Sequence, residues 1–347
     1  MVTRTRVVVI GAGPIGLESA LRLSQAGFDT VVHERNTVAS HVRRWGHVRL
    51  FSPFVMNSSE AGRLAVGENC PPDDALLTGD EFADLYLEPL ARAVTRSAVI
   101  HEHSRVVGVS RESTWKHHHV LERSACADRF RLLVDGMDGE SADQANVVLD
   151  CSGTWGQPNP IGAGGIACPG ERRVMTAGDY EIPDTTTEAA GWFCGRHTLV
   201  VGSGHSAATA VVALAELAAD QPETRVTWIT RGGRSAPMEV LADDPLPGRA
   251  SLAEMANQLA LCDSDIVTWL PGAVVLAIDG GPGEFSVAVE DPGRGRQVIA
   301  ADGVLGLAGS RPDRSLYEEL QVHECYATGG PIRLAAELLG ETSGDCL

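Results

Sequence analysis

The sequence contains no C-x-x-C pair, no apolar run long enough to cross a membrane and no recognisable secretory leader. Its eight cysteines are scattered, which is typical of a protein from a reducing compartment. A thioredoxin-type dithiol and a zinc ribbon both need closely spaced cysteines, so the spacing excludes them, and no metal site is predicted. We therefore expect a cytoplasmic protein without a membrane segment.

Positive charge is also scarce. The 347 residues include 28 Lys and Arg against 46 Asp and Glu, and the formal net charge is −18. Such a chain repels the phosphate backbone of nucleic acids, so we expect no nucleic-acid partner. With 44% hydrophobic residues the chain can fill large cores, and its length suggests two domains or one domain interrupted by another.

The segment 7–35 is the most informative stretch. An apolar run at 7–10 is followed by Gly11-Ala12-Gly13-Pro14-Ile15-Gly16, a helical pattern and a second apolar run at 30–33 that leads into Glu34. Strand, glycine turn, helix, strand and acid make up the dinucleotide-binding unit. Gly11 makes the tight turn, Gly13 lets the backbone approach a pyrophosphate, and Gly16 lets helix and strand pack closely. Glu34 is placed to accept hydrogen bonds from an adenosine ribose.

The chain then repeats this unit. After an apolar strand at 198–201, the turn Gly202-Ser203-Gly204-His205-Ser206-Ala207 opens a helix rich in Ala, Val and Leu, and a strand at 225–230 follows. Each half continues with short alternating strands and closes on a strand that runs into a small residue and a glycine, at 146–153 and 303–309. The sequence therefore predicts an α/β protein with two Rossmann-like domains and two nucleotide cofactors.

Arg231 ends the second strand of the second unit, where NADH-binding proteins usually carry an acid. A guanidinium there suits a 2′-phosphate by bidentate, charge-assisted hydrogen bonds, and Arg234 lies nearby. The residue therefore favours NADPH, the alternative being an ordinary solvated arginine. His205 and Ser206 open the helix beside the expected pyrophosphate.

Two further segments connect these patterns. The segment 154–170 is rich in Gly and Pro and is expected to act as a linker or hinge. Residues 36–95 contain loop-like sequence and one helix at 78–94, which Thr78 can cap with Glu81 as the capping-box partner. His117-His118-His119 is expected in a solvated loop, Cys151 as a buried core thiol, and the acids at 239–244 on a solvated face.

The pairing of VVIGAGPIGL…VHER with VVGSGHSA…WITR resembles the flavoproteins with two dinucleotide-binding domains. Within them the chain looks most like the flavin-containing monooxygenases and their N-hydroxylating relatives. The segment DCSGTWGQP at 150–158 is similar to the family's chain crossover, and LAGSRPD at 307–313 is similar to its A-T-G-x-x-P-D signature. The resemblance implies an FAD domain at 1–165, an inserted NADPH domain at 190–300 and a return to the FAD domain at 301–347.

The resemblance also implies which residues touch the cofactors. Those expected at FAD are Gly11, Gly13, Pro14, Ile15, Gly16, Glu34, Arg35, Trp45, Arg49 and Val106. Those expected at NADPH are Gly202, Ser203, Gly204, His205, Ser206 and Arg231. Asn57 is the one candidate catalytic residue, as an amide donor at the flavin edge. The loop 45–57 is expected to form a wall of the flavin site, and the alternative is a surface loop with a buried tryptophan. The residues of this expected wall are Trp45, His47, Arg49, Phe51, Ser52 and Asn57.

Three features depart from the family pattern. The fingerprint F-x-G-x-x-x-H-x-x-x-F/Y is not found before Gly202, where MTAGDYEIPD stands, and the missing C-x-x-C sets the chain apart from disulfide reductases. After Gly309 nothing reads as the strand ending in Gly-Asp that relatives place against the flavin ribityl chain. We therefore expect either a C-terminally incomplete FAD domain, with loosely held FAD, or a site that closes differently.

The implied function is reduction of FAD by NADPH, followed by oxygenation of a small N- or S-nucleophile through a C4a-hydroperoxyflavin. The expected partners are a small-molecule substrate and molecular oxygen, and the chain is a candidate homodimer. Two alternatives stay open. One is an NADPH-dependent reductase or dehydrogenase that passes electrons to a quinone, a metal centre or a partner protein, and the other is a non-catalytic dinucleotide-sensing module.

Overall fold

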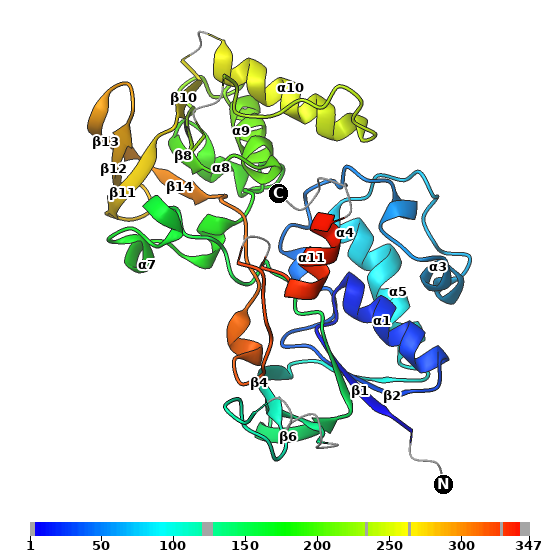
Figure 1. Ribbon diagram of the computed structural model, residues 1–347. Helices are drawn as coiled ribbons and strands as arrows, with labels where there is room; N and C mark the ends of the chain where they lie inside the picture. Colours follow the sequence, from blue (N-terminus) through cyan, green and yellow to red (C-terminus); the bar gives the residue numbers. More distant parts are fainter. Residues whose placement is uncertain (1–3, 120–127, 233–234, 263–264, 327–328, 341–347) are drawn as a thin grey trace. The chain divides into compact units, whose positions relative to one another are not determined.

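The computed structural model describes residues 4–119, 128–232, 235–262, 265–326 and 329–340 (Figure 1). The chain forms two compact units, and neither is one continuous piece of sequence. The first comprises Met1–Arg43, Phe54–Gly156 and Arg311–Leu347, and the second comprises Arg44–Pro53 and Gln157–Ser310. The sequence predicted an inserted domain at residues 190–300. The second unit instead begins before residue 190 and ends after residue 300, and it also includes the ten residues Arg44–Pro53 from the N-terminal part of the chain.

The first unit is built on a parallel sheet with the strand order β3-β2-β1-β7. Its strands are β1 (Arg6–Ile10), β2 (Asp29–His33), β3 (Val99–His101) and β7 (Val147–Asp150). Helix α1 (Pro14–Gln25) packs against β1 and β2, and Gly27 follows it with φ +86°, a conformation that favours glycine. This is the strand–helix–strand unit expected from the segment 7–35.

Residues 36–95 hold the other helices of the first unit. They are α2 (Ser40–Arg43), α3 (Glu60–Val66), α4 (Gly79–Phe82) and α5 (Glu88–Val94). A π-helical turn at Ala83–Leu87 joins α4 to α5, so the helix expected at 78–94 is present with one widened turn. The capping box of Thr78 and Glu81 is confirmed: Glu81 N–H donates to the threonine hydroxyl, and Thr78 N–H donates to the Glu81 carboxylate.

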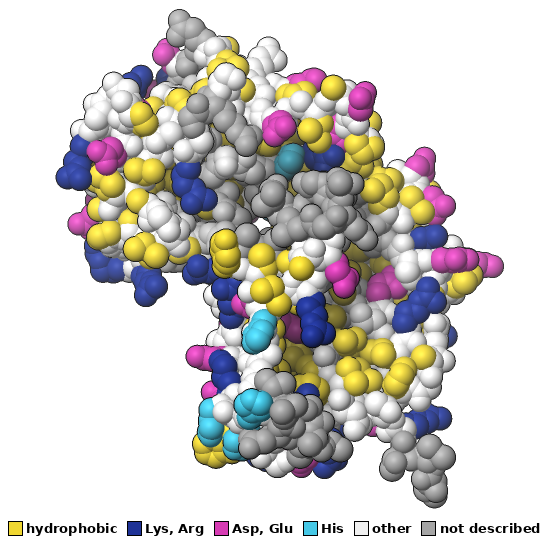
Figure 2. Space-filling model, in the orientation of Figure 1, with side chains coloured by type: hydrophobic (Ala, Val, Ile, Leu, Met, Phe, Trp, Pro, Cys, Tyr) yellow, Lys and Arg dark blue, Asp and Glu magenta, His cyan; other side chains and the backbone are white. Residues whose placement is uncertain are grey.

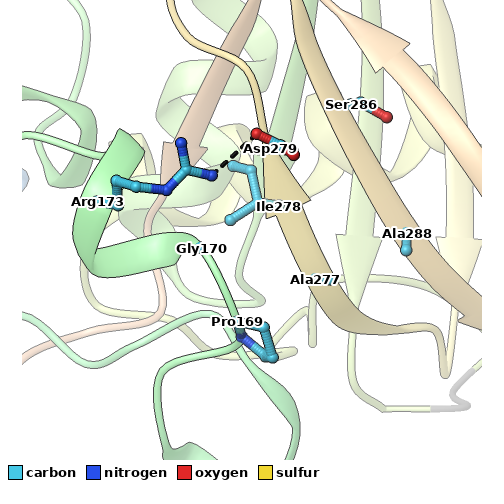
Figure 3. Close-up of a pocket in the computed structure, with 8 residues that line it drawn as sticks. All are labelled: Pro169, Gly170, Arg173, Ala277, Ile278, Asp279, Ser286 and Ala288. Atoms are coloured by element: carbon cyan, nitrogen blue, oxygen red, sulfur yellow. Dashed lines mark hydrogen bonds and ion pairs between the residues drawn. The ribbon is translucent and has the colours of Figure 1, made fainter.

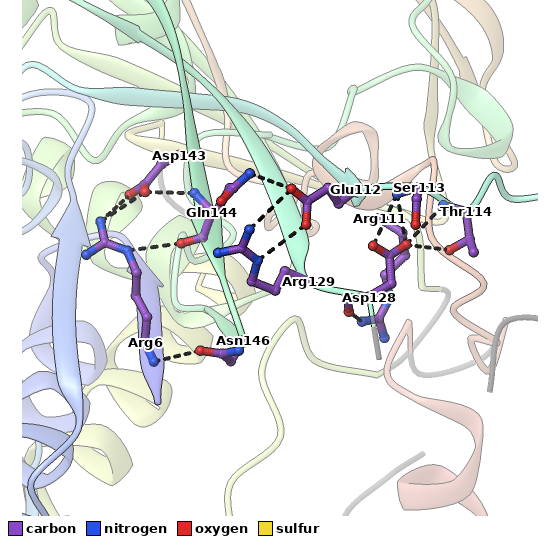
Figure 4. Close-up of polar contacts among 10 residues, drawn as sticks. All are labelled: Arg6, Arg111, Glu112, Ser113, Thr114, Asp128, Arg129, Asp143, Gln144 and Asn146. Carbon is purple, nitrogen blue, oxygen red and sulfur yellow. Dashed lines mark hydrogen bonds and ion pairs between the residues drawn. The ribbon is translucent and has the colours of Figure 1, made fainter. Parts of the chain in front are cut away.

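An antiparallel sheet of β4 (Arg105–Arg111), β5 (Phe130–Gly136) and β6 (Gly139–Ala145) completes the first unit. Strand β6, with the sequence GESADQA, was not predicted because its residues do not alternate between apolar and polar. Two of its polar side chains instead pair with Arg6 of β1 and with Glu112, which directly follows β4 (Figure 4). Arg6 of β1 pairs with Asp143 at 2.9 Å, and Gln144 donates to Glu112, which also pairs with Arg129. An ion pair of Asp143 thus ties this mostly exposed strand to β1.

The second unit repeats the architecture. Its parallel sheet has the order β10-β9-β8-β14, and its antiparallel sheet the order β11-β12-β13. The strands are β8 (His197–Val201), β9 (Arg225–Thr230), β10 (Val267–Pro271), β11 (Val274–Asp279), β12 (Phe285–Asp291), β13 (Gly295–Ala301) and β14 (Gly303–Gly306). Helices α9 (His205–Leu217) and α10 (Pro247–Leu261) pack on each other. The two Rossmann-like units predicted from the sequence repeat are confirmed.

Strand β14 explains why the second unit reaches Ser310. It pairs in parallel with β8, from Gly303 opposite Thr198 to Gly306 opposite Val201, so it is the fourth strand of the second parallel sheet. Residues 303–306 therefore belong to the second unit and not to a segment returning to the first. The return begins at Arg311.

The remaining elements are short. They are α7 (Glu171–Val174), α8 (Ala190–Phe193), α11 (Ile332–Gly340) and 3-10 turns at Phe54–Met56, Ala163–Gly165, Ala177–Tyr180 and Arg314–Tyr317. Among the described residues, no helix combines the length and apolar character that a bilayer span requires. On the face drawn in Figure 2, basic and acidic side chains are interspersed with apolar ones.

A buried carboxylate organises the start of the second unit. Glu171 is only 1% exposed and accepts hydrogen bonds at 2.9 Å from Ile161 N–H, Cys168 N–H and the Tyr180 hydroxyl. Burial and this carboxylate raise the pKa of Tyr180 well above its usual value, so the phenol remains a donor. Much of the Gly- and Pro-rich segment expected to be a hinge is therefore fixed around one side chain.

We predict that Glu171→Gln destabilises the protein. A glutamine keeps one acceptor oxygen and turns an NH₂ group toward a backbone N–H, so at least one buried donor loses its partner. The expected loss is about 1–3 kcal/mol of unfolding free energy, read from urea denaturation followed by circular dichroism. Glu216→Gln, on an exposed position of α9, is the control and should leave the midpoint unchanged; equal midpoints for both variants would contradict the prediction.

Candidate functional site

The glycine turn after β1 divides into two glycines that the fold requires and one that it does not. A Cβ on Gly11, whose φ is +102°, would lie 2.6 Å from the Cys151 carbonyl oxygen, and a Cβ on Gly16 would lie 1.9 Å from the Gly11 carbonyl oxygen. Gly13 has an ordinary φ of −80°, and no heavy atom lies within 4 Å of its Cβ position. The open space at Gly13 is therefore available to a ligand.

The turn after β8 has the same geometry. A Cβ on Gly202, whose φ is +148°, would lie 2.1 Å from the Leu307 carbonyl oxygen, whereas the Cβ position of Gly204 has no atom within 4 Å. Ala207, in place of a third glycine, is completely buried. The indole N–H of the buried Trp228 donates to the Gly202 carbonyl at 2.7 Å and fixes the turn.

Both turns present backbone N–H groups without a side-chain cap. Helices α1 and α9 begin after Gly13 and Gly204, and neither has a capping side chain or an acidic residue in its first turn. By contrast, Ser59 caps α3 and Thr78 caps α4. An uncapped N-terminus offers free donors and a partial positive charge, which is the environment that phosphate groups bind. The residues present therefore fit a dinucleotide at each turn.

Glu34 is more deeply involved in the first turn than the sequence indicated. It is 9% exposed, and its two carboxylate oxygens accept hydrogen bonds from Ala12 N–H at 2.8 Å and Asn36 N–H at 2.9 Å. A carboxylate has capacity for further acceptor bonds, so the expected ribose contact remains compatible with these two. Glu34 thus also holds the glycine turn in place.

A buried polar cluster supports Glu34 from the preceding residue. The imidazole of His33 bonds Ser104 Oγ at 2.7 Å through Nδ1 and Asp143 at 3.1 Å through Nε2. Burial lowers the pKa of His33, although Asp143 opposes the shift, so the ring is neutral at pH 7. Ser104 N–H in turn donates to the Glu34 carbonyl at 2.7 Å. Sequence reasoning missed this cluster because its members are far apart along the chain.

The other residues expected at the first site are dispersed over its unit. Arg35 is exposed and lies 2.7 Å from His41 Nε2, and His41 stacks on Trp155 with ring centroids 6.5 Å apart. Pro14 is the first residue of α1, and Ile15 is 69% exposed. The side chain of Val106 on β4 is buried in the core of the first unit.

The loop expected to form a wall of the flavin site is split between the two units. Trp45 and Arg49 group with the second unit, whereas Asn57 belongs to the first, where its N–H donates to the Phe54 carbonyl at 2.9 Å. The loop of Asn57 is tied to α1 through Glu18. That carboxylate accepts hydrogen bonds from Ser59 Oγ at 2.5 Å and from the hydroxyl of Tyr86, which lies in the π-helical turn. Burial and Glu18 raise the pKa of Tyr86, which keeps its proton.

At the second site, Arg231 follows β9, is exposed and makes no ion pair with another described residue. Arg234 lies outside the described residues. Ser203 and Ser206 are exposed at the turn, and His205 is the first residue of α9. Partial burial and the nearby Arg249 lower the pKa of His205, so its imidazole is neutral at pH 7.

Three remaining expectations concern residues outside the glycine turns. Cys151 is half-buried, and burial raises its pKa, in line with a core thiol. His117 and its two neighbours lie in a turn between β4 and β5. The solvated face expected for the acids at 239–244 is wrong for Asp244, whose side chain is 4% exposed and pairs with Arg249 at 2.7 Å.

A surface hollow of about 320 Å³ lies elsewhere on the second unit (Figure 3). Its charged groups, Arg173 and Asp279, pair with each other at 2.9 Å. The other lining residues are Pro169, Gly170, Ala277, Ile278, Ser286 and Ala288. None of the residues expected to bind a cofactor lines it, so we do not assign a nucleotide to this hollow.

The chain matches one protein family and several solved structures. A family model described as pyridine nucleotide-disulphide oxidoreductase matches residues 5–332. A search of curated proteins found no match. A bacillithiol disulfide reductase from Bacillus cereus is similar in structure, with a TM-score of 0.68, 20% identity, and coverage of 95% of this chain and 85% of that chain.

An N-hydroxylase and a monooxygenase are also similar in structure. Ornithine N-hydroxylase from Kutzneria sp. 744 has a TM-score of 0.60 and 16% identity, over 93% of this chain and 86% of that chain. The desferrioxamine-pathway cadaverine monooxygenase from Erwinia amylovora has a TM-score of 0.58 and 16% identity, over 93% and 83%. These likenesses show the fold, and the activities named for the matched proteins divide between disulfide reduction and monooxygenation.

We predict that Gly13→Val and Gly204→Val each remove one nucleotide and spare the other. Both positions have extended backbone and an open Cβ direction, so valine fits the fold but occupies the space of a pyrophosphate. Gly13→Val should lose FAD, measured by absorbance after gel filtration, and Gly204→Val should lose NADP⁺ binding, measured by calorimetry. Each variant is the folding control for the other; a Gly13→Val protein with stoichiometric FAD would contradict the assignment.

Proposed function

Because the chain belongs to the pyridine nucleotide-disulphide oxidoreductase family, we propose that it is an NADPH-dependent flavin monooxygenase of a small nitrogen or sulfur nucleophile. Binding of FAD and a pyridine nucleotide is typical of this family, so the chain is a flavin oxidoreductase. The finer assignment has support from the sequence resemblance of DCSGTWGQP and LAGSRPD and from the fold shared with the ornithine N-hydroxylase and the cadaverine monooxygenase.

The first glycine turn is the proposed FAD site. Backbone N–H groups at the start of α1 would bind the pyrophosphate beside Gly13, and Glu34 would accept from the ribose while holding the turn. Bound FAD supplies hydride acceptance and reaction with oxygen. Asn57 is the proposed donor near the flavin edge, because an amide can donate a hydrogen bond without adding an acidic proton.

The observation that carries the oxygenase assignment is the state of the cysteine beside the first turn. Cys151 lies where a Cβ on Gly11 or on Gly16 would reach, but it has no C-x-x-C partner, and burial raises its pKa. The sequence therefore has no dithiol pair to relay electrons from a reduced flavin. The electrons can then go to oxygen, to a small substrate or to an external partner, and we assign them to oxygen and a small substrate.

An NADPH-dependent reductase is the second candidate function. The shared fold with a bacillithiol disulfide reductase favours it, and it would use the same two glycine turns. The two functions differ in the fate of the reduced flavin after NADPH has delivered its hydride. Only the monooxygenase transfers an oxygen atom from O₂ to a substrate.

We predict that Arg231 sets a preference for NADPH over NADH. Losing a hydrogen bond to a charged phosphate typically costs about 1.5–3 kcal/mol, so Arg231→Ala should weaken NADP⁺ binding roughly ten- to a hundredfold and leave NAD⁺ binding nearly unchanged. Arg225→Ala, at the opposite end of β9, is the matched control. Calorimetry with both nucleotides checks this, and equal weakening of both would rule out a 2′-phosphate contact.

We predict that the reduced enzyme inserts oxygen. After anaerobic reduction with NADPH and mixing with O₂, stopped-flow spectra should pass through a species distinct from both oxidised and reduced flavin. With a panel of small amines and thioethers under ¹⁸O₂, mass spectrometry should find one labelled atom in the product. A direct return to the oxidised spectrum, with hydrogen peroxide as the oxygen product under every condition, would favour the reductase.

A further inference from the structure

Residues 44–53, which we name the strap, lie in sequence between α2 and Phe54 of the first unit but belong to the second unit. Arg44 forms an ion pair with Glu181 there. Burial raises the pKa of Asp184, but hydrogen bonds from Thr186 and Thr187 and, to a smaller extent, the nearby His47 of the strap lower it to about 2. The strap is therefore bound to the second unit at several points.

Phe51 brings the strap to the second glycine turn. Its ring meets the imidazole of His205 edge-on, with centroids 5.9 Å apart and an interplanar angle of 61°. A Cβ on Gly248, the second residue of α10, would lie 3.6 Å from Phe51 Cδ1, and the ring packs on the core of the second unit. Phe51 therefore contacts the first residue of α9 and the first turn of α10 together.

His205 lies beside the space expected for the pyrophosphate and near a pair of charged side chains. It directly follows Gly204, whose open side is the space expected for a pyrophosphate. The charged groups that act on it are Arg249, which lowers its pKa, and Asp244, which raises it, and these two form a bidentate pair at 2.7 Å. A neutral imidazole can donate one N–H to a phosphate oxygen.

We propose that Phe51 is a positioning residue of the second nucleotide site, because its ring holds His205 where the imidazole donates to the pyrophosphate bound at Gly204. The inference rests on the proposed binding of NADPH at this turn. It assigns a nucleotide-binding task to a residue encoded within the N-terminal half, in a segment where sequence reasoning expected contacts with FAD.

The test is NADP⁺ binding to the FAD-loaded protein, measured by calorimetry. Phe51→Ala should weaken binding roughly three- to tenfold, the loss expected when one hydrogen bond is no longer preorganised. Phe51→Tyr keeps the ring and should restore binding. Phe193→Ala is the matched control, since Phe193 packs on the same core and its ring meets Trp192 instead; equal weakening by both alanine variants would overturn the proposal.

A double-mutant cycle separates positioning from general packing. In a His205→Ala background, Phe51→Ala should cause no further loss, because the group that Phe51 positions is gone. Additive losses would overturn the proposal. In NMR titrations, NADP⁺ should raise the pKa of His205 in the wild type and raise it less in Phe51→Ala, because a nearby phosphate stabilises the imidazolium; an equal rise in both would also overturn it.

Two variants distinguish a wrong role for Phe51 from a wrong position for the nucleotide. If Gly204→Val leaves NADP⁺ binding intact, the nucleotide is not at this turn and both fail. If Gly204→Val abolishes binding and Phe51→Ala does not change it, only the role of Phe51 is wrong. Neither measurement involves oxygen, so the outcome does not depend on whether the enzyme is a monooxygenase or a reductase.

Discussion

The structure depends on a backbone contact that occurs twice, between a glycine turn and the residue that follows the fourth parallel strand. At Gly11 a Cβ would meet the Cys151 carbonyl, and at Gly202 it would meet the Leu307 carbonyl. The returning strands are held there by hydrogen bonds from Cys151 N–H to the Ile10 carbonyl and from Leu307 N–H to the Val201 carbonyl. In each unit the fourth parallel strand therefore has to end beside the glycine turn.

The two glycine turns also give a chain with a net charge of −18 places that suit anionic groups. The turns place uncapped helix N-termini at open space, so backbone dipoles supply the attraction. Acidic groups near the first turn are occupied: Glu34 by two backbone N–H groups, and Glu18 by Ser59 and Tyr86. Local donor geometry, and not overall charge, decides what these sites attract.

Local signals in the sequence were sufficient for the parts of the fold that repeat a known pattern. The glycine turns, the helix start at Thr78 and the pairing of two Rossmann-like units are confirmed because each depends on neighbouring residues. Strand β6 was missed because its residues do not alternate between apolar and polar, and because its partners, such as Arg6, are remote in sequence. For the same reason the contact between His33 and Asp143 could not be foreseen from spacing, and neither could the assignment of residues 44–53 to the second unit.

The strap also affects how the chain can fold while it is being synthesised. Phe51 leaves the ribosome long before the strands of the second unit, yet its packing partners His205 and Gly248 are made only later. Until then the emerging chain carries this aromatic side chain without its native cover, while β1, β2 and α1 can already assemble. A separately produced fragment of residues 157–310 would lack the strap altogether, so the second unit is not a genetically separable module.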